Sequence, residues 1–253
     1  MVNQAIASQY TLAYSVPRYV QIAEGFVSQI ESGELAPGDR LSPERELSDR
    51  LGVNRMTLRR ALRLLELQGL LVRKHGIGTF IAEPKIDRQM DIVFRFTRGM
   101  QKRGYTPGAK VISIDQISLG AALARELEVS ADSSAYQILR LRSINLEPVL
   151  LESYTIPASR FLGLDNYDLE NRSIYEVMEN EYGVTIVSAR QSFEPVIANK
   201  YEADLLGVPV GAPLMMEKRV TRDKDHCPVE YGKDRYRGDR FRFVTEAAAP
   251  FDL

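Results

Sequence analysis

The sequence predicts an α+β protein in two parts: a short helical part that ends in a β-hairpin, and a longer part of mostly antiparallel strands with helices. Three observations support this prediction. Between residues 17 and 68, apolar residues recur every three or four positions, the period of amphipathic helices. From about residue 92 onward, alternating strand patterns and short helical patterns take over. A length of 253 residues also suits two domains.

Positive charge is concentrated in the first part. Nine lysine or arginine residues and four acidic residues lie between Arg40 and Phe80, whereas the whole chain has a formal net charge of -1. A basic module joined to an acidic body indicates a polyanionic partner for the basic part only. We therefore expect four segments: an N-terminal tail (1–16), a basic domain (17–82), a polar linker (83–91) and a second domain (92–253).

Three helices are expected in the basic domain. The first begins after Pro17 and ends near Gly33. For the second, Ser42 is the expected cap, Pro43 the first helical residue and Gly52 the end. The third helix spans residues 55–68, and its inward face consists of Leu58, Ala61, Leu62 and Leu65.

The outer face of the third helix is expected to carry arginine. Arg55, Arg59 and Arg63 follow at steps of four, so they form one stripe. After this helix, "LLVRKHGIGTFIAE" predicts a hairpin with a tight turn at His75 and Gly76. Two short helices joined by a turn, the second striped with arginine and followed by a hairpin wing, are typical of a winged helix-turn-helix that binds double-stranded DNA.

The stretch "LSPERELSDRLGVNRMTLRRALRLLELQGLLVRKHGIGTFI" resembles the winged helix-turn-helix of the GntR family of bacterial transcription regulators, and the resemblance covers nearly all of residues 17–82. It implies contacts with an operator by the residues at matching positions. Because arginine can pair with guanine through two hydrogen bonds, we expect Arg45 and Arg55 to read bases. We expect Arg59, Arg63 and Lys74 to contact phosphates. The remaining expected interface residues are Asn54, Thr57, His75 and Gly76.

The second domain alternates strand and helix patterns. Strands are expected at 110–118, 136–144, 148–156, 185–198, 213–223 and 228–238, and helices at 121–129, 173–183 and 199–207. An internal echo repeats a helix, a strand bearing arginine, a turn and Pro-Val, with Leu127, Val129 and Arg140 matching Leu206, Val208 and Arg219. We expect the two copies to pair into one sheet.

Charged residues on these strands suggest a ligand site. Arg140 and Arg142 are two residues apart on a strand, so they point to the same face, and Glu152 lies on the neighbouring strand. Thr97 stands at a predicted helix start, where backbone N–H groups favour an anion. Charged residues on strands are more often solvated than ligating, so the spacing alone leaves both interpretations open.

A second resemblance concerns "FTRGMQKRGYTPG", "RLRSINLEPVLLESYTIP", "SIYEVMENEYG" and "PVEYGKDRYRGDRF". The span from about 92 to 245 resembles the UTRA effector domain of the HutC-type branch of the GntR family, which has a chorismate-lyase-like fold and binds small metabolites. The resemblance implies a homodimeric repressor that binds a palindromic operator and is released by an anionic metabolite such as a sugar phosphate. The pocket residues it implies are Thr97, Arg98, Arg140, Arg142, Glu152, Ser173, Tyr175, Glu230 and Tyr236.

Three alternatives remain at this point: an enzyme of the chorismate-lyase type, a GntR regulator with an all-helical metal-binding domain, and a DNA-binding protein without a ligand. The sequence shows no catalytic triad and only two histidines, so we expect no enzyme activity, no metal and no cofactor. One cysteine, Cys227, fits a reducing compartment, and no apolar run approaches the ~20 residues that span a membrane. We therefore expect a cytoplasmic protein without a membrane partner.

Overall fold

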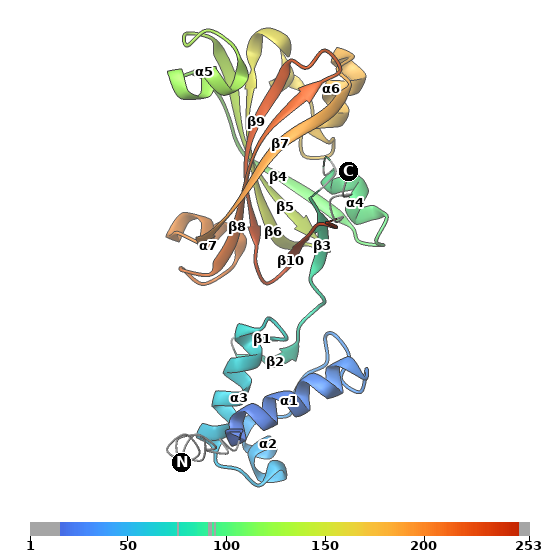
Figure 1. Ribbon diagram of the computed structural model, residues 1–253, viewed down its shortest axis with the longest axis vertical. Helices are drawn as coiled ribbons and strands as arrows, with labels where there is room; N and C mark the ends of the chain where they lie inside the picture. Colours follow the sequence, from blue (N-terminus) through green and yellow to red (C-terminus); the bar gives the residue numbers. More distant parts are fainter. Residues whose placement is uncertain (1–15, 75, 91–92, 94, 248–253) are drawn as a thin grey trace, which may run out of the picture. The chain divides into compact units, whose positions relative to one another are not determined.

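The computed structural model describes residues 16–74, 76–90, 93 and 95–247, and it divides after Pro84 into two compact units (Figure 1). The expected N-terminal tail therefore falls almost entirely outside the described residues, as does His75. Among the described residues, every helix is too short or too polar to cross a membrane.

The first unit contains three helices and a two-stranded hairpin. Its elements are α1 (Arg18–Glu31), α2 (Glu44–Leu51), α3 (Arg55–Leu67), β1 (Leu71–Lys74) and β2 (Gly78–Ile81). One apolar core holds them together, and in it Leu47, Leu58 and Leu65 are at most 1% exposed. The four residues that the helical period placed on the inner side of α3 are all buried.

The ends of these helices differ in one respect from the sequence prediction. The predicted capping role of Ser42 is wrong, because Pro43 is the N-cap residue of α2 and no side chain caps this end. Gly52 ends α2 with φ 61°, in the left-handed region that glycine adopts without strain. Two residues later, Asn54 caps α3 through a hydrogen bond that its Oδ1 accepts from the backbone N–H of Thr57 at 2.8 Å.

The second unit is built around a six-stranded antiparallel sheet with the order β4-β5-β6-β9-β8-β7. The strands are β4 (Pro107–Ser118), β5 (Ser134–Ile144), β6 (Glu147–Pro157), β7 (Ile186–Ile197), β8 (Pro213–Asp223) and β9 (Pro228–Arg237). The helices are α4 (Phe96–Gln101), α5 (Ala121–Leu127), α6 (Ile174–Tyr182) and α7 (Lys200–Leu206), with 3₁₀ turns at Ala158–Arg160 and Leu164–Asn166. This mixed architecture confirms the predicted fold class.

The internal echo in the sequence corresponds to two halves of this sheet. Each half runs strand, helix, hairpin: β4-α5-β5-β6 and β7-α7-β8-β9, and the halves meet where β6 pairs with β9. The first half's hairpin turns at Asn145 and Leu146, whose positive φ values of 49° and 70° are those of a tight two-residue turn. This turn, together with the register shift between Arg142 and Ser143, places Arg140 opposite Glu152.

The prediction of a linker at 83–91 is wrong for four residues, which form a strand. β3 (Ile86–Gln89) pairs in parallel with β10 (Phe241–Val244), near the C-terminal end of the described chain. Ile86 and Arg88 are buried on this strand, whereas Asp87 forms an exposed ion pair with Arg242 at 2.8 Å. The chain therefore enters the second unit as a packed strand directly after Pro84.

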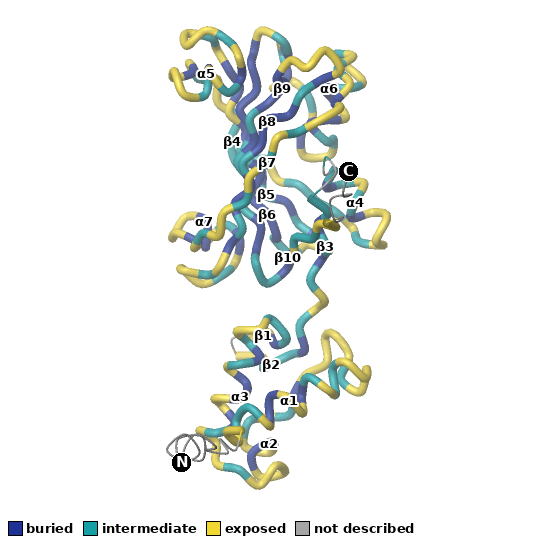
Figure 2. The backbone as a smooth tube through the Cα atoms, in the orientation of Figure 1, coloured by how far each residue is buried: buried dark blue, intermediate teal, exposed yellow. Residues whose placement is uncertain are grey.

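The strands β5, β6, β8 and β9 are buried along much of their length (Figure 2). One face of the six-stranded sheet carries a buried polar belt between two apolar clusters. On β5, Tyr136, Ile138 and Ile144 pack in those clusters, while Arg140 and Arg142 lie between them on the same face. Charged residues continue the belt across the adjacent strands: Glu152 on β6, Glu230 and Asp234 on β9, and Glu217 and Arg219 on β8. All are at most 7% exposed.

Candidate functional site

The outer surface of the first unit displays the predicted arginines. Arg45 on α2 and the stripe of Arg55, Arg59 and Arg63 on α3 are exposed. Thr57 is half-buried, and its backbone N–H is occupied by the Asn54 cap, so Asn54 serves α3 itself in the free protein. Because the apolar face of α3 is buried, its arginine face is the side that remains for a partner.

Glu44 forms ion pairs with two of the basic side chains of this surface. Its carboxylate accepts a hydrogen bond from Arg59 Nε at 2.7 Å and pairs with Arg73 of β1 at 3.2 Å. Both arginine side chains are more than half exposed, so each remains reachable by a partner. A phosphate would compete with Glu44 for these two guanidinium groups.

The wing is the β1–β2 hairpin, whose strands pair from Leu71–Ile81 to Lys74–Gly78. Gly76 is exposed and has φ 71°, and Gly78 has φ 143°. A Cβ atom on Gly78 would lie 2.8 Å from Arg40 Nε, so glycine allows Arg40 to pack on the hairpin. The side chain of Lys74 and all of His75 lie outside the described residues, and their expected DNA contacts stay predictions.

Replacement of Glu44 by Gln is expected to strengthen the predicted DNA binding at low salt for all sequences, by about 0.2–1 kcal/mol per chain, because it removes a competitor for Arg59 and Arg73. Titrations of labelled duplexes at several salt concentrations measure this. Glu24→Gln, an exposed change on α1, is the control. Weaker binding by Glu44→Gln would contradict the competition and indicate that Glu44 orients the arginines for DNA.

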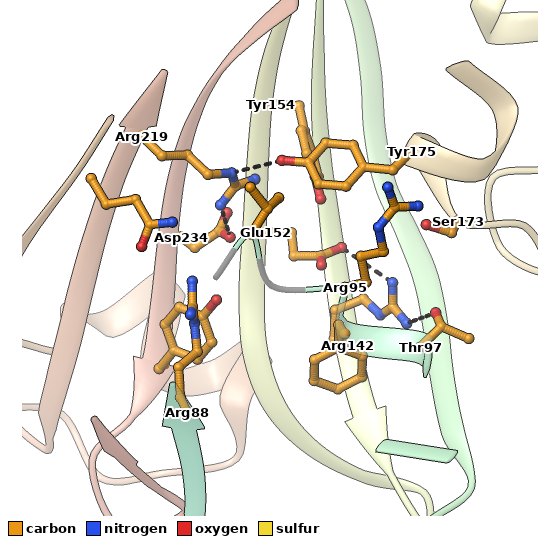
Figure 3. A pocket seen from close by; sticks show the side chains of 14 residues that line it. Arg88, Arg95, Thr97, Arg142, Glu152, Tyr154, Ser173, Tyr175, Arg219 and Asp234 are labelled. Carbon is orange, nitrogen blue, oxygen red and sulfur yellow. Dashed lines mark hydrogen bonds and ion pairs between the residues drawn. The ribbon is translucent and has the colours of Figure 1, made fainter. Parts of the chain in front are cut away.

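A polar pocket opens on the buried belt of the second unit (Figure 3). Residues from β3, the α4 segment, α6 and the strands β5 to β9 line it: Arg88, Val93, Arg95, Phe96, Thr97, Arg142, Glu152, Tyr154, Ser173, Tyr175, Gln191, Arg219, Asp234 and Tyr236. Its free volume is about 20 Å³, which is room for about one water molecule. The side chains of the pocket therefore fill it in this conformation, and a larger ligand has to displace some of them.

One end of the pocket is formed by Arg142, Glu152 and Thr97. Arg142 donates to Thr97 Oγ1 at 2.9 Å and lies 3.4 Å from Glu152 Oε2, with its guanidinium 4.4 Å from the Phe96 ring centre. Burial lowers the pKa of Arg142; Glu152 opposes this effect and the nearby charge of Arg140 adds to it. Only one of the hydrogen-bond partners of Arg142, Glu152, is charged, and Arg140 shares that carboxylate, so an anionic ligand group would add to the compensation of the Arg142 charge.

Arg140 lies behind this end and outside the pocket lining. It pairs with Glu152 at 2.9 Å and donates to the carbonyls of Leu169 at 2.9 Å and Arg172 at 3.3 Å. Burial raises the pKa of Glu152, but the charges of Arg142 and Arg140 outweigh burial and hold that pKa below its ordinary value. Arg140 therefore positions Glu152 and the loop before α6.

The opposite end of the pocket is formed around Arg219. Its Nε donates to Glu230 Oε1 at 2.9 Å and to the Tyr175 hydroxyl at 3.1 Å, and its Nη1 pairs with Asp234. A Cβ atom on Gly232 would lie 2.5 Å from the Arg219 guanidinium carbon, so a glycine in the middle of β9 makes room for this side chain. Glu230 lies behind Tyr175 and Arg219 and does not line the pocket itself.

The entering strand β3 contributes Arg88 to the pocket. Its side chain is 1% exposed and pairs with Glu217 at 2.7 Å, while the Tyr236 hydroxyl donates to the other oxygen of Glu217 at 2.9 Å. The Arg88 guanidinium also lies 5.8 Å from the Tyr236 ring centre. A pocket residue thus sits four positions after Pro84, on the segment that joins the two units.

The structure brings most of the predicted pocket residues together, and three of them lie outside the pocket lining. Thr97, Arg142, Glu152, Ser173, Tyr175 and Tyr236 line the pocket, whereas Arg140 and Glu230 stand behind it. Arg98 is exposed on α4, and Arg95 lines the pocket instead, paired with Glu179 at 2.6 Å. Among the charged lining residues, sequence reasoning missed Arg88, Arg95, Arg219 and Asp234. The match of Arg219 with Arg140 in the internal echo could have identified Arg219.

The pKa of the Asp234 carboxyl group in the pocket is strongly raised. Burial, together with the charges of Glu152 and Glu217, raises its pKa to about 7, although Arg219 opposes the shift. Because the folded protein then binds a proton more tightly than the unfolded chain, Asp234 makes stability fall as pH rises from about 4 through about 7.

Replacement of Asp234 by Asn removes this titration. Between about pH 5 and pH 8, we expect the wild-type Tm to fall relative to the Tm of Asp234→Asn, as measured by thermal unfolding in matched buffers. Asp115→Asn, an exposed change on β4, controls for loss of one carboxylate. Parallel pH profiles for the wild type and Asp234→Asn would show that Asp234 is ionised across this range.

Comparisons with known proteins agree with this two-part arrangement. The model of bacterial regulatory proteins of the gntR family matches residues 18–81, and the UTRA domain model matches residues 102–242. The HTH-type transcriptional repressor NagR of Bacillus subtilis is 38% identical over 229 residues, which is 90% of this chain and 94% of that protein. The histidine utilization repressor of Pseudomonas aeruginosa is 31% identical over 81% of each chain.

A solved structure shares the architecture. The crystal structure of PhnF from Mycobacterium smegmatis superposes with a TM-score of 0.65 at 26% identity, covering 92% of this chain and all of that chain. The second unit is a sheet with helices, so the alternative of an all-helical metal-binding domain is wrong. Within the described residues, no group of three or more His, Cys, Asp or Glu side chains is arranged to hold a metal ion.

Proposed function

Because this chain belongs to the GntR family of bacterial regulatory proteins and carries a UTRA domain, we propose that it is a repressor that binds a palindromic operator as a homodimer and leaves it when an anionic metabolite enters the UTRA pocket. Relatives that match almost its whole length are transcriptional repressors. The main observation in favour of an anionic effector is that the buried Arg142, which shares its one carboxylate partner with Arg140, lines the pocket.

The proposed DNA interface is the arginine face of α3 together with Arg45 and the wing. Arg55 stands at the first position of α3, the end of a recognition helix that reaches base edges. Arg59, Arg63 and Lys74 would contact phosphates and fix the position of the protein on the duplex. Two such units must sit about one helical turn, ~34 Å, apart to read both halves of a palindrome.

The proposed effector binds with its anionic group at Arg142 and Thr97. Since the free volume is only about 20 Å³, the ligand must move lining side chains, and Arg95, 28% exposed, is the lining arginine most accessible to solvent. Displacement near Arg88 would be transmitted along β3 to the segment at Pro84 that carries the DNA-binding unit. Such linkage between two sites has a typical size of ~1–3 kcal/mol.

Selection of DNA from a random library with the full chain tests the operator and the dimer. We expect enrichment of inverted half-sites whose centres lie about one helical turn apart, bound by two chains per duplex. Light scattering of the complex gives the stoichiometry. Enrichment of a single, unrepeated site bound by one chain would contradict the dimeric, palindromic mode.

Arg142→Gln tests the effector site. We expect the affinity for sugar phosphates to fall roughly 10- to 100-fold, since a hydrogen bond to a charged group contributes about 1.5–3 kcal/mol. Operator affinity without ligand should not change. Isothermal titration with a panel of sugar phosphates measures the first effect, and Arg125→Gln, an exposed arginine of α5, is the control. Equal ligand affinity in both variants would place the anion site elsewhere.

A further inference from the structure

The two ends of the pocket carry opposite excess charge. At the Thr97 end, Arg140 and Arg142 share the single carboxylate of Glu152, and all three side chains are at most 5% exposed. Among the described side chains at this end, two positive charges therefore face one negative charge. The additional partners of these arginines are neutral carbonyls and a hydroxyl.

The end around Arg219 has the reverse imbalance. Three carboxylates, Glu217, Glu230 and Asp234, are at most 2% exposed, and the described cations paired with them are Arg88 and Arg219. In the pocket lining at this end, the buried Gln191 Oε1 has no hydrogen-bond donor among the described residues. A buried acceptor left without a donor costs about 1–3 kcal/mol, so this end favours a ligand that donates hydrogen bonds.

From this opposite excess we infer that the effector is zwitterionic, with an anionic group bound at Arg142 and Thr97 and an ammonium group bound beside Asp234. The inference rests on the proposed function and narrows its ligand class. In a buried site, a ligand of this charge pattern compensates both ends at once, whereas a purely anionic ligand leaves the carboxylate excess in place. An ammonium group also supplies three hydrogen-bond donors.

The titration of Asp234 supports this assignment. Its carboxyl group faces Arg219 and Glu217 of β8 and Glu152 of β6, and it accepts a hydrogen bond from the backbone N–H of Ser153. Burial and the two neighbouring carboxylates raise its pKa to about 7. An ammonium group placed there would favour the ionised carboxylate and would lower the raised pKa of Asp234.

Three sugar phosphates that differ at one position test the inference. Glucosamine 6-phosphate carries an ammonium group, whereas glucose 6-phosphate and N-acetylglucosamine 6-phosphate carry neutral groups at the same carbon. By isothermal titration with the full chain near neutral pH, we expect the ammonium compound to bind about tenfold or more tightly than either neutral compound. In Asp234→Asn this ratio should fall to about 1. Glu194→Gln, an exposed carboxylate on β7, should keep the wild-type ratio.

The outcomes separate the inference from the proposed function. Equal binding of all three compounds by the wild type would overturn the zwitterion and leave the anionic effector standing. A preference for the ammonium compound that persists in a folded Asp234→Asn protein would overturn the assignment to Asp234. Binding of none of the three compounds would contradict both the zwitterion and the sugar-phosphate effector. Operator binding is measured in a separate experiment, so this outcome would not affect the proposal that the protein binds an operator.

Discussion

Arg55→Ala is expected to abolish most sequence-specific binding while leaving general DNA binding almost intact. Arg55 is exposed at the first turn of α3, where a bidentate contact with guanine contributes about 1–3 kcal/mol of discrimination. A dimer that reads two half-sites would lose about 2–6 kcal/mol, so operator affinity falls at least about 30-fold. Fluorescence anisotropy with operator and scrambled duplexes measures the ratio of the two affinities.

Two variants give this experiment its controls. Arg60 lies on the same helix, with its guanidinium 5.9 Å from the Tyr19 ring centre of α1, so Arg60→Ala removes an equal charge from another face. Lys74→Ala should weaken binding to operator and scrambled DNA equally and flatten the salt dependence, as expected for a phosphate contact. Indistinguishable behaviour of Arg55→Ala and Lys74→Ala across sequences would contradict the division between base and phosphate contacts.

Glu152→Gln is expected to have the largest effect on stability. The Glu152 carboxylate is the shared anionic partner of Arg140 and Arg142, and removal of one member of a buried ion pair typically costs about 3–5 kcal/mol. For a unit of this size, each kcal/mol lowers Tm by about 2–4 °C, so a fall of roughly 6–20 °C is expected. Differential scanning calorimetry of the full chain resolves the transition of the second unit.

Glu194→Gln is the matched control for the expected fall in Tm. Glu194 pairs with Lys218 at 2.8 Å, but its side chain is 50% exposed, and an exposed pair of this kind contributes about 0–1 kcal/mol. If Glu152→Gln lowered Tm no more than Glu194→Gln does, the buried polar belt would not be the electrostatic network described above.

Much of the fold could be predicted because local rules act on adjacent residues. The helical period located the buried face of α3, and strand alternation placed Arg140 and Arg142 on one face of β5. The same alternation could not show whether these arginines are solvated or buried. Their burial depends on Glu152 opposite Arg140, and therefore on the register set by the Asn145–Leu146 turn and by the shift between Arg142 and Ser143.

The errors concern contacts between distant segments. Residues 86–89 looked like a polar linker because nothing nearby in the sequence pairs with them, and their partner is β10, more than 150 residues later. For the same reason Arg88 was not recognised as a pocket residue. On the short helix α4, family position suggested Arg98, but the chain turns so that Arg95 lines the pocket and Arg98 is exposed.

The most direct test of the whole account is operator affinity with and without a ligand in the UTRA pocket. A labelled operator from the selection experiment is titrated with the full chain, alone and with a saturating sugar phosphate that binds in calorimetry. We predict that the ligand weakens operator binding by about 5- to 150-fold in the wild type and leaves Arg142→Gln unaffected. A ligand that saturates the pocket while operator affinity stays constant would contradict the proposed coupling between pocket and DNA.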